Sequence, residues 1–237
     1  EGIINPVSSE LFIQAIADAE KDDAEALIIQ LDTPGGLDLS MRDIIKAIIA
    51  SSVPVVVHVY PSGGRSASAG VFITLAAHIA AMAPGTNMGA AHPVAMGGEK
   101  MDEETNKKVE NDAAAYIRSI AEQRGRNAIW AEEAVRKSVS VTETEALQLK
   151  LVDFIAEDVT ALIKQMDGRE VTTAKGKKVL ATTGAQIIKK ELGLRHKILK
   201  AIADPNVAYI LMMLGTTGLI AELYSPGLTF PGVLGAI

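Results

Sequence analysis

The sequence predicts an α/β fold in which helices cover a mostly parallel sheet, and three observations indicate it. Short runs of Val, Ile and Leu recur along the chain, as in strands that are buried on both faces. Segments with apolar residues at helical spacing separate these runs, which favours βαβ crossover connections. Aromatic residues make up only 4% of the 237 residues although 48% are hydrophobic, so Ala, Ile, Leu and Val build the core. We therefore expect one large domain, with or without an appendage.

Composition also excludes several classes of protein. The formal net charge is −6 with no basic excess, so binding to nucleic acid has no electrostatic support. The chain has no cysteine, which excludes disulfides, thiolate metal sites and a cysteine nucleophile. No His/Glu pair with helical ligand spacing lies near the glycine turns described below, and we expect neither a metal nor another cofactor.

The N-terminal part of the chain alternates strands with helices. Ser8 or Ser9 is expected to cap the first helix, because a hydroxyl accepts a hydrogen bond from a free amide at a helix start. In order we expect a strand at Ile3–Ile4, a helix over Glu10–Lys21, a strand over Ala26–Leu31, a helix over Leu39–Ser51, a strand over Val55–Tyr60, a helical run over Val71–His78, and strands over Ile79–Ala83 and Asn87–Gly89.

The central part is richer in helices. Gly125 ends a long polar helix, Asn127 caps the next one, and Thr142 with Glu145 forms a capping box. In order we expect helices over Asp102–Arg124, Ala128–Lys137 and Thr142–Leu149, a strand over Leu151–Ile155, a helix over Asp158–Met166, and a small polar hairpin of Glu170–Thr173 with Lys178–Ala181.

The C-terminal part changes character. Ile187–Ala203 is amphipathic and basic, and Val207–Leu223 is apolar except at three residues. The apolar run approaches the roughly 17-residue lower limit for a bilayer span, and another begins at Leu228. A basic amphipathic helix before a glycine-containing apolar helix favours a membrane segment. The alternative is a buried hydrophobic helix hairpin.

Ser68 is the candidate nucleophile. The strand Val55–Tyr60 ends in a Pro/Gly turn, small residues follow, and a helical run begins just after Ser68. This strand–turn–helix layout presents a nucleophile, and the helix points its first amides and positive dipole end at the serine. The Ala69 N–H would help to hold an oxyanion there. The alternative interpretation is a small-residue connection between a buried strand and a helix.

A second glycine turn supports the first. Gly35 and Gly36 end the buried strand Ala26–Leu31, and glycine lets backbone amides approach a substrate without a side chain in between. Alone, Pro-Gly-Gly predicts an ordinary turn. Because both turns follow central strands, we expect them at the same edge of the parallel sheet, where open α/β folds bind ligands. Together they favour an oxyanion site.

Four motifs together resemble one known family. In chain order they resemble the NfeD family of membrane-bound serine peptidases, relatives of signal peptide peptidase A and of the Clp protease subunit. The resemblance covers essentially the whole chain. The motifs are Leu31–Gly36 (LDTPGG), Arg65–Gly70 (RSASAG), Met82–Ala90 (MAPGTNMGA) and the tail Val207–Ile237.

The resemblance implies a fold and a chemistry. It implies a Clp/crotonase-like α/β core with Ser68 as nucleophile and a lysine as general base. From the two turns and the apolar run we also expect an oxyanion hole at Gly36 and Ala69 and a C-terminal transmembrane segment. We expect the serine peptidase domain over residues 1–168, a polar hairpin and basic linker over 169–203, and the start of a membrane region over 204–237.

The resemblance points to Lys108 as the base. In the family pattern the lysine lies about two helical turns before the stretch that corresponds here to Tyr116–Ser119, which gives Lys108, 40 residues after Ser68. Lys107 is the adjacent alternative. A lysine base must be neutral, and burial lowers the ordinary amine pKa of about 10.4 by disfavouring the charged form. From local sequence alone, a solvated helix face is the favoured interpretation. The acidic neighbours on this helix are Glu103, Glu104 and Glu110.

His92 is the competing base. It lies 24 residues after Ser68 in a His-Pro loop, a position that resembles the catalytic histidine of the Clp subunit. The Clp triad also needs an acid, and that position falls at about Ser138 here. A histidine without its carboxylate is poorly oriented, so we rank the Ser68–Lys108 dyad above a Ser68–His92 pair.

We therefore expect a membrane-associated serine endopeptidase that cleaves hydrophobic segments of membrane proteins. The resemblance implies association with stomatin-like (SPFH) proteins, whose hydrophobic C-terminal region is the substrate of an archaeal family member. We expect a homodimer or a higher homo-oligomer at a prokaryotic cell membrane, with the peptidase domain outside the cytoplasm. The alternatives are a crotonase-type enzyme with a carboxylate base and an acyl-CoA site, or a non-catalytic membrane scaffold for stomatin-like proteins.

Overall fold

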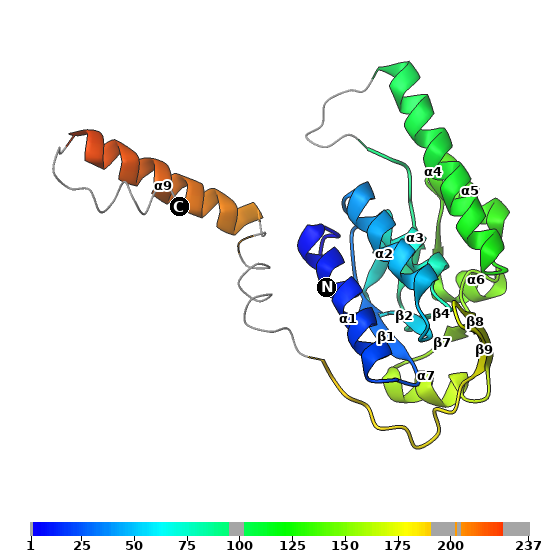
Figure 1. Cartoon of the computed structure of the whole chain (residues 1–237). Coiled ribbons are helices and arrows are strands. Elements are labelled where there is room, and N and C mark those ends of the chain that lie inside the picture. The colour runs from blue at the N-terminus through cyan, green and yellow to red at the C-terminus, as the bar shows by residue number, and fades with distance from the viewer. Residues whose placement is uncertain (1, 95–101, 191–201, 203–204, 225–237) are drawn as a thin grey trace. The chain divides into compact units, whose positions relative to one another are not determined.

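The computed structural model describes residues 2–94, 102–190, 202 and 205–224 (Figure 1). Two compact units divide the chain, residues 1–188 and residues 189–237. The first unit contains both glycine turns and all candidate site residues. It includes the hairpin near residue 175, so the expected boundary at residue 168 falls inside this unit.

A four-stranded parallel sheet forms the centre of the first unit, which confirms the predicted α/β class. Its strand order is β1-β2-β4-β7, and all five residues of β2 are buried. Full burial on both faces explains why these strands are continuous apolar runs in the sequence. The strands are β1 (Leu27–Leu31), β2 (Val55–Val59), β4 (Ile79–Met82) and β7 (Phe154–Ile155). The last is shorter than the expected Leu151–Ile155.

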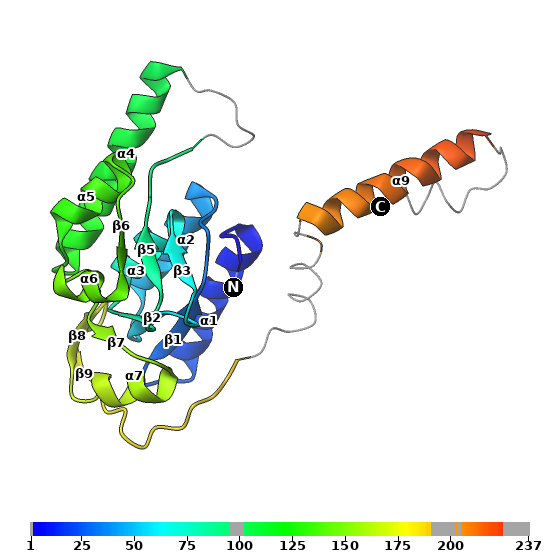
Figure 2. The ribbon, with the colours of Figure 1, turned by 180° about the vertical axis from the view of Figure 1, so that it is seen from behind.

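The two faces of this sheet carry different cores. The larger core packs α1, α2 and α3 against Val55, Val57 and Val59 of β2, and extends to α4 and α5. The smaller core packs α7 and the hairpin β8–β9 against Val56 (Figure 1; Figure 2). The helices are α1 (Pro6–Lys21), α2 (Asp38–Ala50), α3 (Ala69–Ala76), α4 (Glu103–Gln123), α5 (Ala128–Arg136) and α7 (Val159–Met166), and the hairpin is β8 (Glu170–Thr173) with β9 (Gly176–Val179).

A second, three-stranded sheet lies next to the serine turn. It has the order β3-β5-β6, with β3 parallel and β6 antiparallel to β5. The strands are β3 (Arg65–Ala67), β5 (Asn87–Gly89) and β6 (Ser140–Thr142). Of these three strands, only β5 was predicted. β3 and β6 were missed because each has three residues and no apolar pattern. The Thr142–Glu145 capping box opens α6 (Glu143–Gln148) as predicted.

The start of the chain differs from the prediction. Asn5, not Ser8 or Ser9, caps α1: its Oδ1 accepts from the Ser8 N–H at 2.9 Å, and Ser8 Oγ accepts from the Asn5 N–H at 2.8 Å. The proline at position 6 fits the first helical turn, where no amide hydrogen bond is lost. The expected strand at Ile3–Ile4 is reduced to a single bridge between Ile4 and Gly36.

In the second unit, α9 (Pro205–Tyr224) contains the apolar run predicted over Val207–Leu223. Many of its large apolar side chains are exposed, among them Tyr209, Met212 and Leu214. Within the described part of the chain, none of the helices combines the length and the hydropathy that a membrane crossing requires. Most of the expected amphipathic helix over Ile187–Ala203, and the run from Leu228, lie outside the described residues.

Candidate active site

Ser68 stands on a strained turn between β3 and α3. Its backbone angles are φ 51° and ψ −117°, a combination that costs a non-glycine residue on the order of 1–3 kcal/mol. Its N–H donates to the carbonyls of Gly89 (3.3 Å) and Ala90 (3.2 Å), which hold the turn in place. The serine is half-buried and begins a fully buried helix. This is the strained strand-to-helix turn that exposes a nucleophile in many hydrolases.

The Gly35–Gly36 turn packs directly against Ser68, as expected from the two strand ends. A Cβ at Gly35 would lie 2.5 Å from Ser68 Cβ and 3.0 Å from Ser68 Oγ, and Gly35 has φ +118°. A Cβ at Gly36 would lie 2.0 Å from the Ile4 carbonyl oxygen. Both positions therefore accept only glycine, and the turn places bare backbone beside the serine hydroxyl.

Two backbone amides near Ser68 are free to hold an oxyanion. Ile4 N–H donates to the Gly35 carbonyl and Leu37 N–H donates to the Ile4 carbonyl, so the Gly36 N–H points away from this pairing. Gly36 is exposed, and no hydrogen bond of its N–H occurs among the described residues. The Ala69 N–H lies in the first turn of α3, where helical amides have no internal partner.

Hydrogen bonds of buried hydroxyl groups stabilise the two turns. Thr33 Oγ1 accepts from the Gly35 N–H and donates to the Gly35 carbonyl, both at 3.1 Å. Ser66 Oγ and Thr74 Oγ1 are hydrogen-bonded at 2.8 Å, which ties β3 to α3. Sequence reasoning did not single out these three residues, although Thr33 lies within the LDTPGG motif.

The other end of α3 is held by Arg126. Its buried guanidinium donates to the carbonyls of Leu75 (3.2 Å) and Ala77 (3.3 Å), and it forms an ion pair with Asp153 at 3.0 Å. These contacts satisfy carbonyls at the C-terminal end of the helix, which otherwise lack partners. The helix that begins at Ser68 is thus fixed at both ends.

Lys108 lies on an exposed part of α4. Its side chain is 73% exposed and its Nζ forms an ion pair with Glu104 Oε1 at 2.7 Å. Lys107 is similarly exposed and pairs with Glu103 at 3.0 Å. The N-terminal half of α4 projects beyond the rest of this unit (Figure 1; Figure 2). The structure therefore does not show the burial that a neutral lysine base requires.

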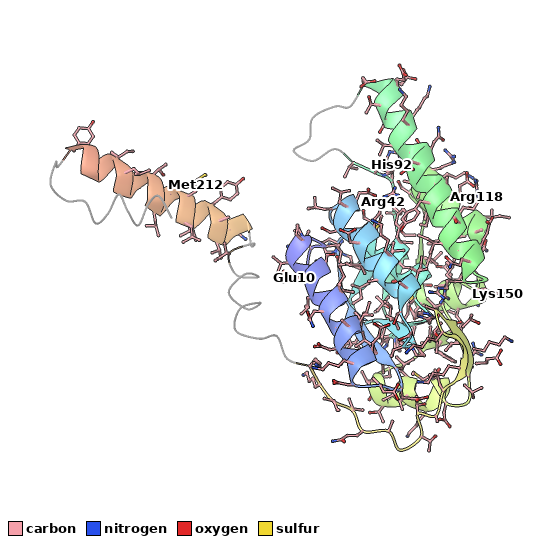
Figure 3. All side chains as sticks on the ribbon, in the orientation of Figure 1. Glu10, Arg42, His92, Arg118, Lys150 and Met212 are labelled. Atoms are coloured by element: carbon pink, nitrogen blue, oxygen red, sulfur yellow. The ribbon has the colours of Figure 1, made fainter. Side chains whose placement is uncertain are left out.

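His92 lies closer to the serine turn along the chain. It follows by two residues Ala90, whose carbonyl accepts from the Ser68 N–H, and it lies on the segment that leaves the core after β5 (Figure 3). His92 Nδ1 donates to the Val135 carbonyl at 3.0 Å, since a carbonyl only accepts. In the neutral ring this leaves the Nε2 lone pair available. Among the described residues, neither His92 nor Lys108 hydrogen-bonds to Ser68 Oγ.

The other described histidines have structural contacts. His58 is fully buried with Nε2 2.9 Å from the Ala156 carbonyl oxygen. His78 Nδ1 accepts from the Val55 N–H at 3.1 Å, and burial, together with the nearby Arg124 charge, lowers the pKa of His78 to about 4. Among residues 2–94, 102–190 and 205–224, no group of three or more His, Asp or Glu side chains is arranged to hold a metal.

Fold and turn define the class of this protein. ClpP1 from Listeria monocytogenes superposes with a TM-score of 0.55 at 21% identity, over 68% of this chain and 91% of that chain, so the fold is ClpP-like. The chain belongs to the NfeD family: the family model for the NfeD1b N-terminal domain matches residues 4–189. The model for the NfeD integral membrane domain matches residues 206–237.

Solved and curated relatives agree with this assignment. The chain is 39% identical to the membrane-bound protease PH1510 of Pyrococcus horikoshii, over 100% of this chain and 54% of that protein. A lysine-to-alanine variant of a stomatin-specific membrane-bound protease, 1510-N, in complex with a substrate peptide, superposes with a TM-score of 0.79 at 36% identity, over 86% of this chain and 94% of that one. The serine-to-alanine variant gives 0.76 at 36% identity, over 81% and 94%. The chain spans about half the length of the curated relatives it matches.

Proposed function

We propose that this chain is the peptidase part of a membrane-associated serine endopeptidase, with Ser68 as nucleophile and Lys108 as general base. The observation that carries the proposal is the strained Ser68 turn packed against Gly35, with the free amides of Gly36 and Ala69 beside it. A serine held in this way has no evident structural use, whereas acyl transfer needs both the hydroxyl and the paired amides.

The residues carry out acyl transfer in two steps. Ser68 Oγ attacks the scissile carbonyl carbon while the neutral Lys108 amine takes the hydroxyl proton, and the carbonyl oxygen becomes an oxyanion held by the Gly36 and Ala69 amides. The ammonium returns the proton to the leaving amine as the C–N bond breaks, leaving an acyl-enzyme. Water, deprotonated by the same lysine, then hydrolyses the ester and restores Ser68.

The spacing of the residues substituted in the 1510-N variants supports Lys108 as the base. The substituted serine and lysine of the 1510-N variants lie 41 residues apart, and Ser68 and Lys108 lie 40 apart. One gap in the loop before α4 accounts for the difference, while Lys107 would need a gap of two. Because Lys108 is exposed in the isolated chain, the proposal requires that substrate or a further part of the protein cover α4 and exclude water from the amine.

A Ser68–His92 pair is the second candidate, and one observation favours it. The Nδ1–H···O=C bond to Val135 fixes the His92 ring and leaves Nε2 as an acceptor, the tautomer that a general base needs. Ser138, at the expected acid position, supplies no carboxylate to stabilise the imidazolium. We therefore rank this pair below the dyad.

The substrate follows from the relatives as a proposal. The 1510-N protease is described as specific for a stomatin homologue. We propose that this chain likewise cleaves apolar segments of a stomatin-like (SPFH) protein of the same organism. The match of residues 206–237 to an integral membrane domain supports action at a membrane. We also propose that the peptidase domain lies outside the cytoplasm and that the protein forms a homodimer or a higher homo-oligomer.

Cleavage of a fluorogenic apolar peptide tests the assignment. We expect Ser68→Ala to abolish turnover, Lys108→Ala to lower kcat by roughly 100- to 10,000-fold, and His92→Ala to retain most of it. Ser62→Ala, an exposed serine in the preceding turn, is the matched control and keeps full activity. Loss in His92→Ala together with full activity in Lys108→Ala would promote His92 to general base. Equal rates in Ser68→Ala and wild type would end the peptidase proposal.

A further inference from the structure

Arg42 is the centre of a charged cluster between α2 and α4. Its Nε donates to Asp38 Oδ2 at 2.8 Å, one turn earlier on α2, and its Nη2 donates to Asp112 Oδ2 on α4. The guanidinium carbon lies 4.3 Å from the centre of the Tyr116 ring. The Arg42 side chain is only 24% exposed, and its planar guanidinium contacts two carboxylates and an aromatic face.

The cluster joins the three helices that carry the proposed machinery. α2 starts at Asp38, two residues after the oxyanion turn residue Gly36. Tyr116 stacks on Phe72, with ring centroids 6.1 Å apart, and Phe72 lies one turn into the helix that begins after Ser68. Arg42 therefore connects the helix after Gly36 to α4, at the level where α4 meets the helix after Ser68.

The same contacts distinguish the two candidate lysines by the side of α4 that each one occupies. Lys108 precedes Asp112 by four residues, so both side chains leave α4 on the same side. Lys107 precedes Asp112 by five residues and leaves the helix about 140° away around its axis. Because Asp112 contacts Arg42 of α2, Lys108 is the candidate lysine that shares this side of α4.

We propose that Arg42 is a positioning residue for the general base Lys108. Arg42 acts by holding α4, the helix that carries Lys108, through Asp112 and Tyr116. This inference rests on the proposed Ser68–Lys108 dyad. One effect follows from the contacts: the ion pair and the ring contact fix the rotation of α4 relative to α2, and with it the side of α4 from which Lys108 leaves.

The test is kinetic, on the whole chain with the fluorogenic apolar peptide. We expect Arg42→Gln to lower kcat by roughly 10- to 100-fold with KM little changed, because a small misplacement of a catalytic group is costly. The dependence of kcat on pH should change together with kcat, because the substitution acts on the group that takes the proton from Ser68. Arg42→Lys keeps the charge but not the fork and the stacking, and should recover part of the loss.

Two further variants make the result decisive. Arg42→Gln combined with Asp112→Asn should be no slower than the slower single variant, because both changes remove one pairing. Arg118→Gln is the matched control: Arg118 joins α4 to α5 through Glu132 at 2.8 Å, on another side of the same helix, and its loss should leave kcat and the pH profile unchanged.

The outcomes separate this inference from the proposed function. Unchanged kcat and pH profile in Arg42→Gln, while Ser68→Ala and Lys108→Ala are inactive, would overturn the positioning role and leave the dyad intact. A loss of activity that only follows a lowered melting temperature, with the pH profile in place, would also overturn it. Full activity in Lys108→Ala would remove the dyad and this inference with it.

Discussion

The Ser68 turn and the N-terminal half of α4 carry the two halves of the proposed chemistry, yet they are built in opposite ways. Ser68 is held by backbone hydrogen bonds, by glycines without room for a Cβ, and by a helix fixed at both ends. Lys108 lies on a helical segment whose side chains are mostly exposed, and its partner Glu104 is itself 80% exposed.

This difference teaches which part of the site is preorganised. The proposed nucleophile and oxyanion amides already have fixed positions in the isolated chain, so substrate binding need not order them. The proposed base depends on contacts between helices, among them the Arg42–Asp112 and Arg136–Glu110 pairs. Changes at the turn should therefore act through the fixed geometry of Ser68, whereas changes on α4 should act through the alignment of the proposed base.

The largest effect that this comparison predicts is at Gly35. In Gly35→Ala the new methyl group would lie 2.5 Å from Ser68 Cβ on a backbone with φ +118°, so the turn must shift. We expect kcat/KM to fall by roughly 100-fold or more, with a lower melting temperature. Gly63→Ala is the control, because Gly63 has φ +84° but open space around its Cα. Similar activity in the two variants would show that backbone strain alone, and not the contact with Ser68, governs the effect.

A smaller effect is a loss of stability at low pH, caused by a buried histidine next to α3, the helix that begins after Ser68. His78 lies just beyond the C-terminal end of α3, with a pKa lowered to about 4 chiefly by burial. The unfolded chain, with a histidine pKa of about 6.5, binds one more proton between these values, so stability is fully present above pH 6.5 and falls as the pH decreases towards 4. We expect this group to remove about 2 kcal/mol of unfolding free energy between pH 7 and pH 5.

The matched variant is His78→Asn, whose side-chain oxygen can still accept from the Val55 N–H but does not titrate. Urea unfolding at pH 7 and pH 5 of both proteins isolates the histidine from the carboxylates that they share. The same loss of stability in both proteins would mean that His78 is not the titrating group, and that the packed region is not the acid-sensitive one.

Much of the fold was predictable because burial leaves a direct pattern in the sequence. Strands such as β2, buried on both faces, are uninterrupted apolar runs, and the caps of α5 and α6 follow local side-chain chemistry at Asn127 and Thr142. The proximity of the two glycine turns was also predictable, since parallel strands end at one edge. The short strands β3 and β6 were not, because their pairing is set by neighbours and not by their own residues.

The candidate site likewise has a part that local sequence indicates and a part that depends on contacts between distant residues. Ser68 and the glycines are local features, and the sequence alone indicated them. Arg42 and Asp112 are 70 residues apart, and no local pattern links a basic residue on one helix to an acidic residue on another. The exposure of Lys108 agrees with the solvated helix face that the local sequence favoured, whereas the role of general base came from the family resemblance alone.

Covalent labelling of Ser68 tests the central claim most directly. We expect a fluorophosphonate to add one phosphonyl group to the wild-type chain, and peptide mapping by mass spectrometry to locate it on Ser68. Labelling should be slowed in Gly35→Ala and absent in Ser68→Ala, with Ser62→Ala behaving as wild type. A preorganised nucleophile predicts this result. A label on another serine, or none on Ser68 in a preparation that cleaves the apolar peptide, would contradict it.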